Sequence, residues 1–151
     1  MSPYIFMVAG EESGDRLGAP LIAAIKRRTK DSAGFSGVGG AQMAQEGLQS
    51  LFPLGDLAIM GFGEIPARLP KILRRIRETA DAVVAAKPDV LVIIDSPEFT
   101  HRVARRVRRI APAIPIVDYV CPSVWAWRPG RARAMRAYVD HVLHCCRSSR
   151  R

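Results

Sequence analysis

The sequence is poor in cysteine and contains no long hydrophobic run. Its three cysteines among 151 residues are an odd number, and Cys145 and Cys146 are adjacent. This usage does not fit a disulfide framework and is typical of a reducing compartment. No apolar run approaches the roughly 20 residues of a membrane-spanning helix, and residues 1–9 lack the basic leader and cleavage site of a signal peptide. We therefore expect a cytoplasmic protein whose contact with any membrane is peripheral.

Acidic residues are also scarce. The chain has 14 Asp and Glu against 23 Lys and Arg, which gives a net charge of +9. A positive excess of this size favours an anionic partner, which can be nucleic acid, a phosphorylated substrate or an acidic lipid. Hydrophobic residues make up 48% of the chain and charged residues 25%, a composition typical of a folded domain with its own core.

What the sequence does contain is an alternation of strand and helix patterns. Residues 4–9 form an apolar run typical of a buried strand, residues 10–15 a glycine-containing loop, and residues 17–28 a helical pattern. Further along, the patterns predict strands over about 34–40, 90–94, 114–120 and 139–143, and helices over about 42–45, 69–84, 98–110 and 131–138. This order predicts an α/β fold, a Rossmann-like parallel sheet with helices on both faces.

Ligands of open parallel sheets bind beyond the carboxyl ends of the strands, so the loops that follow strands are the candidate sites. The first loop, residues 10–15, places small residues before a helix N-terminus, which favours anions and hydroxyl-rich groups. An equally good interpretation is a turn in which Ser13 or Asp15 caps the helix. The loop matches neither the dinucleotide fingerprint, nor the P-loop, nor the nucleophile elbow.

Two further loops contain candidate functional side chains. Asp95 follows an apolar strand, where a carboxylate partly shielded from water is a better general base than one on the surface; taken alone, a helix N-cap is the commoner role. Residues 125–128 (WAWR) combine two aromatic faces with a guanidinium, as sugar and phosphate sites do, although core filling explains them as well. His141, His144 and the adjacent cysteines lack the ligand spacing of structural zinc.

Together these motifs resemble those of the lipid-A-disaccharide synthases, glycosyltransferases of the two-domain GT-B type. The resemblance runs from about residue 6 to 143 and is carried by residues 8–15 (VAGEESGD), 37–40 (GVGG), 60–62 (MGF), 87–89 (KPD), 94–97 (IDSP) and 122–128 (PSVWAWR). It implies an inverting transfer of 2,3-diacylglucosamine from UDP to 2,3-diacylglucosamine 1-phosphate. The implied products are UDP and a β-1,6-linked disaccharide, and no metal or cofactor is implied.

The resemblance also assigns roles to individual residues. Asp95 matches the family's proposed catalytic base. The implied substrate-binding residues are Gly10, Glu11, Ser13, Gly14, Asp15, Ser123, Trp125, Trp127 and Arg128. A basic and apolar stretch suits the surface of an anionic inner membrane; its residues are Met60, Phe62, Leu69, Lys71, Ile72, Arg74 and Arg75. A helix packed on the core with a solvated basic side is the alternative for this stretch, and one helix can do both.

The resemblance to the family does not extend over the whole chain. Cys121 stands where the family commonly has serine, a change that conserves volume. Residues 1–143 correspond to the N-terminal, acceptor-side domain, whereas residues 144–151 form a basic tail that does not match. From the resemblance we expect that the C-terminal domain that binds the UDP-sugar is missing from this chain. We therefore expect no disaccharide synthesis by this chain alone and some tendency to self-associate.

Two other functions compete with this prediction. A non-catalytic basic domain would hold acidic lipid or nucleic acid through its arginine-rich helices, but no nucleic-acid-binding motif is present, which disfavours nucleic acid. A dinucleotide-dependent oxidoreductase would share the fold, but the required fingerprint and ribose-binding acid are missing.

Overall fold

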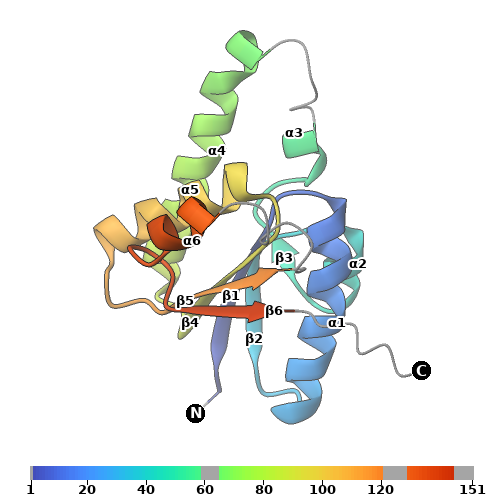
Figure 1. Cartoon of the computed structure of the whole chain (residues 1–151). Coiled ribbons are helices and arrows are strands. Elements are labelled where there is room, and N and C mark those ends of the chain that lie inside the picture. The colour runs from blue at the N-terminus through green and yellow to red at the C-terminus, as the bar shows by residue number, and fades with distance from the viewer. Residues whose placement is uncertain (1, 59–64, 121–128, 145–151) are drawn as a thin grey trace, which may run out of the picture.

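The computed structural model describes residues 2–58, 65–120 and 129–144, which form one parallel sheet with helices on both faces (Figure 1). The strands within these residues are β1 (Tyr4–Ala9), β2 (Gly34–Val38), β3 (Gln49–Ser50), β4 (Val90–Ile94), β5 (Ile116–Val120) and β6 (His141–His144). The helices are α1 (Glu12–Arg28), α2 (Ala41–Gln45), α3 (Gly55–Ala58), α4 (Ile65–Ala86), α5 (Pro97–Ile110) and α6 (Pro129–Met135). The strand order is β3-β2-β1-β4-β5-β6, and every recorded pairing is parallel.

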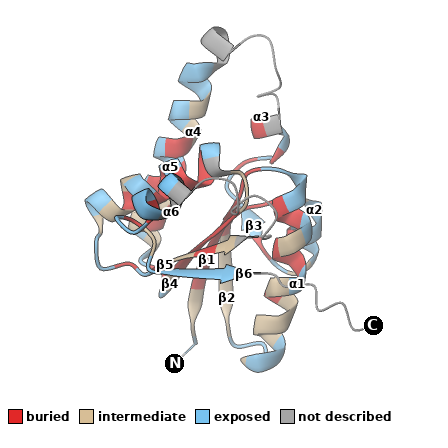
Figure 2. Cartoon of the chain, in the orientation of Figure 1, coloured by how far each residue is buried: buried red, intermediate tan, exposed pale blue. Residues whose placement is uncertain are grey.

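The two faces of the sheet carry separate hydrophobic cores. Along β1, Phe6 and Val8 pack toward α4 and α5, whereas Ile5 and Met7 pack toward α1 and α2. Figure 2 shows the buried residues in the strands and on the inner sides of the helices. Because β1 and β4 are covered on both faces, their sequences are apolar without alternation, as a parallel sheet requires. The predicted Rossmann-like α/β fold is confirmed.

Several boundaries differ from the prediction. Helix α1 begins at Glu12, inside the predicted loop, after Glu11 in an extended conformation with φ −156° and ψ 173°. Ser13, Gly14 and Asp15 therefore lie in the first turn of the helix. Strand β3 and helix α3 were not predicted, because two and four residues are too few to show a hydrophobic period.

One glycine allows the sheet to form at its second strand. Gly37 lies opposite Met7 in the β1–β2 pairing and has a φ of +147°. A Cβ atom at this position would lie 1.7 Å from the carbonyl oxygen of Met7. A residue with a side chain would therefore push β2 away from β1.

Asp140 connects the second half of the sheet to α5. Its Oδ2 accepts a hydrogen bond from the amide of Ile116 at 2.8 Å and another from the guanidinium of Arg108, and its own amide donates to the Ile116 carbonyl at 2.8 Å. Burial raises the pKa of the Asp140 carboxyl, but the Ile116 amide and Arg108 outweigh this effect, so the pKa lies below its usual value.

We predict that Asp140→Asn lowers the free energy of unfolding near neutral pH and that the loss shrinks in acid. A carboxyl whose pKa is lower in the folded state stabilises the fold above its unfolded-state pKa of about 4. That contribution disappears as the pH falls through the folded-state pKa. Urea denaturation from about pH 7 to pH 3 measures the effect, with Asp31→Asn, an exposed residue, as the control. A loss that stays constant over this range would contradict the prediction.

Candidate functional site

The candidate site lies where the strand order reverses. From β1 the chain proceeds outward to β2 and β3, and it then returns to β4 on the other side of β1. The carboxyl ends of β1 and β4 therefore flank the topological switch point, where ligands of such sheets bind. Ala9 lies opposite Ile94 in the pairing of these strands, so the residues that follow each strand start side by side.

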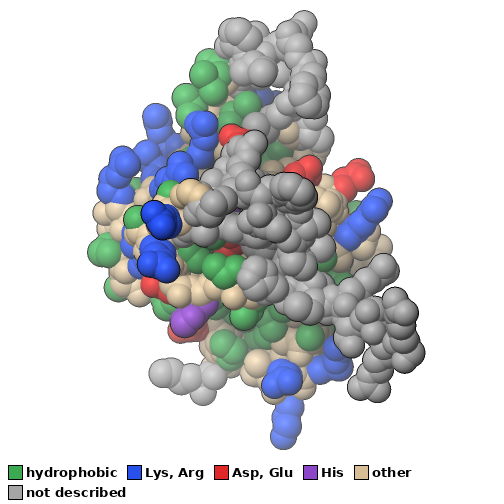
Figure 3. Space-filling model, in the orientation of Figure 1, with side chains coloured by type: hydrophobic (Ala, Val, Ile, Leu, Met, Phe, Trp, Pro, Cys, Tyr) green, Lys and Arg blue, Asp and Glu red, His purple; other side chains and the backbone are tan. Residues whose placement is uncertain are grey.

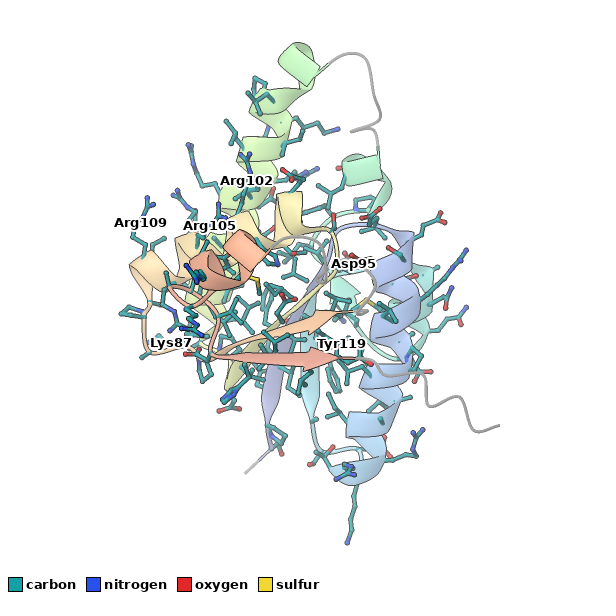
Figure 4. All side chains as sticks on the ribbon, in the orientation of Figure 1. Lys87, Asp95, Arg102, Arg105, Arg109 and Tyr119 are labelled. Atoms are coloured by element: carbon teal, nitrogen blue, oxygen red, sulfur yellow. The ribbon has the colours of Figure 1, made fainter. Side chains whose placement is uncertain are left out.

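A hydrogen bond joins the two predicted motifs across this point. The hydroxyl of Ser13 donates to Oδ2 of Asp95 at 2.7 Å, although 82 residues separate them in sequence. Asp95 is half-buried and Ser13 is exposed, so both remain within reach of solvent. Figure 4 labels Asp95 at the end of β4. The positive end of the α1 dipole also lies here, since Ser13 belongs to the first turn of that helix.

The turn that carries Asp95 has an unusual backbone. Asp95 has a φ of 51° and Ser96 a φ of 48°, and neither is glycine. Left-handed residues of this kind cost about 1–3 kcal/mol each and occur often at functional sites. Ser96, and not Asp95, is the N-cap of α5, and Glu11, rather than Ser13 or Asp15, is the N-cap of α1. The capping alternatives considered for Asp95, Ser13 and Asp15 are therefore wrong.

Gly10 and Gly14 let the two strands' loops approach closely. A Cβ atom on Gly10 would lie 2.4 Å from Oγ of Ser96, and one on Gly14 would lie 3.0 Å from the carbonyl oxygen of Ile94. Both glycines are buried. The space beside both glycines is thus filled by the protein itself, whereas Glu11, which lies between them in sequence, is exposed.

Asp15 interacts with the backbone of the neighbouring loop. Its carboxylate accepts hydrogen bonds from the amides of Gly40 at 2.9 Å, Met43 at 3.0 Å and Gln42 at 3.1 Å. These amides belong to the start of α2, whose N-cap is Gly40. Because the side chain is only 6% exposed, Asp15 fixes the 37–40 segment and is not available to a ligand in this arrangement.

Other predicted site residues lie outside the described residues. These are Ser123, Trp125, Trp127, Arg128, Met60 and Phe62. Only the strand before the tryptophan motif is placed: Tyr119 of β5 lies opposite Ile94 of β4, so β5 ends at the same edge of the sheet as Asp95.

The predicted membrane-surface residues of α4 divide into two groups. Leu69, Lys71 and Arg74 are exposed, as is Leu73, which the sequence analysis did not single out. Ile72 is half-buried and packs against the core. Arg75, also predicted to face the membrane, contacts other parts of the protein instead. Its guanidinium lies over the ring of Phe52 and pairs with Asp56 and Glu78.

Basic side chains lie on more than one part of the surface, including the last turn of α1, where Arg27 and Arg28 are exposed. Figure 3 shows lysine and arginine side chains over the α4–α6 side. On α5, Arg102, Arg105 and Arg109 are exposed and point away from the sheet in Figure 4. Arg105 also lies over the ring of Tyr138, with its guanidinium carbon 5.0 Å from the ring centre.

A buried polar cluster was missed by the sequence analysis. His101 Nδ1 is 2.8 Å from the Tyr138 hydroxyl, and its Nε2 is 3.3 Å from Oδ2 of Asp118. All three side chains are buried, so the cluster ties α5 to β5 and to the segment after α6. A histidine one helical turn after Pro97 gave no sequence signal that would distinguish this contact from a surface position.

In the part of the chain that the structure describes, no group of three His, Cys, Asp or Glu residues could hold a metal ion. None of the helices in that part is both long enough and apolar enough to cross a bilayer.

Two sequence comparisons with known proteins agree. A family model described as lipid-A-disaccharide synthetase matches residues 5–145. Lipid-A-disaccharide synthases of Nitrobacter hamburgensis and Nitrobacter winogradskyi are 71% and 68% identical over 94% of this chain. That of Rhodopseudomonas palustris is 67% identical over 92%. The chain spans only about a third of the length of these curated relatives, 35–36%.

We predict that Asp15→Asn lowers the free energy of unfolding by about 1–3 kcal/mol, because a side-chain NH₂ replaces an oxygen that accepts a backbone hydrogen bond. Glu12→Gln is the matched control, since it removes a charge from an exposed position of the same helical turn. Chemical denaturation of both variants measures the difference. Equal losses would show that Asp15 acts only as a charge near the helix N-terminus.

Proposed function

This chain belongs to the lipid-A-disaccharide synthetase family, and we propose that it forms the acceptor-side half of an inverting glycosyltransferase. The proposed reaction transfers 2,3-diacylglucosamine from UDP to 2,3-diacylglucosamine 1-phosphate. The 6-hydroxyl oxygen of the acceptor bonds to the anomeric carbon of the donor sugar. The bond from that carbon to the diphosphate breaks, and UDP leaves with the electron pair.

The proposed base for this step is Asp95, which takes the proton of the acceptor hydroxyl. The observation that carries the proposal is the position of its carboxylate at the switch point, half-buried and hydrogen-bonded to Ser13. Ser13 occupies Oδ2, and among the described residues no hydrogen bond reaches Oδ1. General base catalysis of this kind typically contributes 10²–10⁴-fold to a rate.

The neighbouring residues take different parts in the proposed site. Glu11 and Ser13 are exposed at the start of α1, where Ser13 bonds to Asp95, and both can contact the acceptor sugar. Gly10 and Gly14 bring the two strand ends together, and Asp15 orders the 37–40 segment, so we assign these three residues a positioning part in place of direct substrate contact. Ser123, Trp125, Trp127 and Arg128 remain predicted substrate contacts.

We further propose that the protein works on the cytoplasmic side of the inner membrane, attached peripherally. The support is the outer side of α4, where Leu69 and Leu73 are each 43% exposed beside Lys71 and Arg74. Apolar side chains enter the headgroup region, and each basic residue near an anionic surface adds about 1 kcal/mol. Met60 and Phe62 remain predicted members of this surface.

The arginines of α5 support a second candidate function, which is the binding of a polyanion without catalysis. Arg102, Arg105 and Arg109 are exposed on one side of the helix, and within residues 2–58, 65–120 and 129–144 no carboxylate forms a salt bridge with them. Nucleic acid and anionic lipid are both compatible with this charge. The exposed leucines of α4 favour lipid.

We predict that Asp95→Asn lowers the kcat for disaccharide formation by about 10²–10⁴-fold and changes the KM for the acceptor little. Because the chain spans a third of its relatives, the assay uses this chain joined to the remaining segment of the Nitrobacter hamburgensis protein. Asp31→Asn is the control, because Asp31 is exposed and follows the C-terminal end of α1, whereas Ser13 lies at the N-terminal end of that helix. Full activity of Asp95→Asn would contradict the role of the base.

We predict that the chain binds vesicles containing anionic lipid and that Leu73→Ser weakens this binding. Leu51→Ser is the matched control, because Leu51 is 40% exposed but lies outside α4. Cosedimentation over a salt series measures binding to vesicles and, in parallel, to duplex DNA. Steeply salt-dependent binding to DNA without binding to vesicles would favour the nucleic-acid function instead.

A further inference from the structure

The turn at Asp95 is fixed by more than the motif residues. Strand β4 ends at Ile94, which pairs with Ala9 on one side and Tyr119 on the other. Asp95 and Ser96 lie beyond this ladder and both have positive φ. Non-glycine residues keep such a conformation only where the surrounding structure holds them.

Thr100 provides the contact at the backbone of this turn. Its hydroxyl donates to the carbonyl oxygen of Asp95 at 2.7 Å and lies 3.1 Å from that of Ser96. The side chain is fully buried, at 0% exposure. The Ser96 carbonyl also accepts hydrogen bonds from the amides of Phe99 at 3.1 Å and Thr100 at 3.0 Å. The carbonyl of Asp95 is thus held by a side chain from the next helix.

A second threonine shows why this contact is more than ordinary helix bonding. Thr79 of α4 is also fully buried, and its hydroxyl donates to the carbonyl of Arg75, four residues earlier in the same helix, at 2.7 Å. Thr100 reaches five residues back, beyond the first residue of α5, to Asp95. Its hydroxyl therefore acts on the strand-to-helix turn itself.

We propose that Thr100 is a positioning residue for Asp95. The Thr100 hydroxyl fixes the orientation of the Asp95 carbonyl from α5, and the Ser13 hydroxyl fixes the carboxylate from α1. Gly10 leaves the space that Ser96 needs in this arrangement. The catalytic part of the inference rests on the proposed function, whereas the structural part does not.

The test compares Thr100→Val, which keeps the shape but removes the hydroxyl, with Thr100→Ser, which keeps the hydroxyl. Thr79→Val is the matched control. In this chain, NMR resonances of the Asp95 and Ser96 backbone should shift in Thr100→Val, return in Thr100→Ser and remain in place in Thr79→Val. In the extended chain used for the transfer assay, Thr100→Val should lower kcat by about 10- to 100-fold, with KM for the acceptor little changed. Thr100→Ala supplies a second variant without the hydroxyl if the valine does not fold.

The possible results separate the two proposals. Unchanged Asp95 and Ser96 resonances in Thr100→Val and Thr100→Ala would overturn the positioning role, and so would equal losses of kcat in Thr100→Val and Thr79→Val. Shifted resonances together with full transfer activity of Asp95→Asn would support the positioning of the turn and overturn the proposed function.

Discussion

The parallel pairing of β1 with β4, with Ala9 opposite Ile94, is the constraint on which the candidate site depends. The two strands are distant in sequence, and only this register brings the loop after each one to the same point of the sheet. Apolar side chains on both faces of both strands stabilise the pairing, because each strand contributes to the core on either side. The hydrogen bond from Ser13 to Asp95 is a consequence of that register.

Close approach at this point determines the residue types around it. The glycines at 10 and 14 stand where a Cβ atom would collide with β4 or its turn. The turn at Asp95 and Ser96 is in turn held in a left-handed conformation by hydrogen bonds from buried groups of α5. Asp15 fixes the next strand end in a similar way, because its carboxylate accepts hydrogen bonds from the amides of the segment after β2. Three neighbouring strand ends are thereby fixed relative to one another.

Much of this arrangement could be predicted from the sequence. The uninterrupted apolar runs of β1 and β4 indicated buried parallel strands, and the position of Asp95 after one of them indicated a ligand-facing edge. The roles of Asp15 and Arg75 could not be predicted, because each depends on partners 19 to 28 residues away that no local pattern specifies. The start of α1 was placed too late for a related reason. Gly14 and the polar residues around it are typical of a loop, but in the structure they form the first turn of α1, where Ser13 bonds to Asp95 and Asp15 to the start of α2.

A chain of packed side chains connects α4, the proposed membrane surface, to the turn that carries Asp95, the proposed base. Arg75 of α4 lies over the ring of Phe52, 4.5 Å from its centre, and this ring meets Phe99 edge-on at 6.4 Å. Phe99 belongs to the first turn of α5, directly after the turn that carries Asp95. Because Phe52 and Phe99 are buried and in contact, α4 packs through them against the first turn of α5, next to the Asp95 turn. If α4 lies against the bilayer as proposed, its orientation there also sets the height of Asp95 above the lipid headgroups.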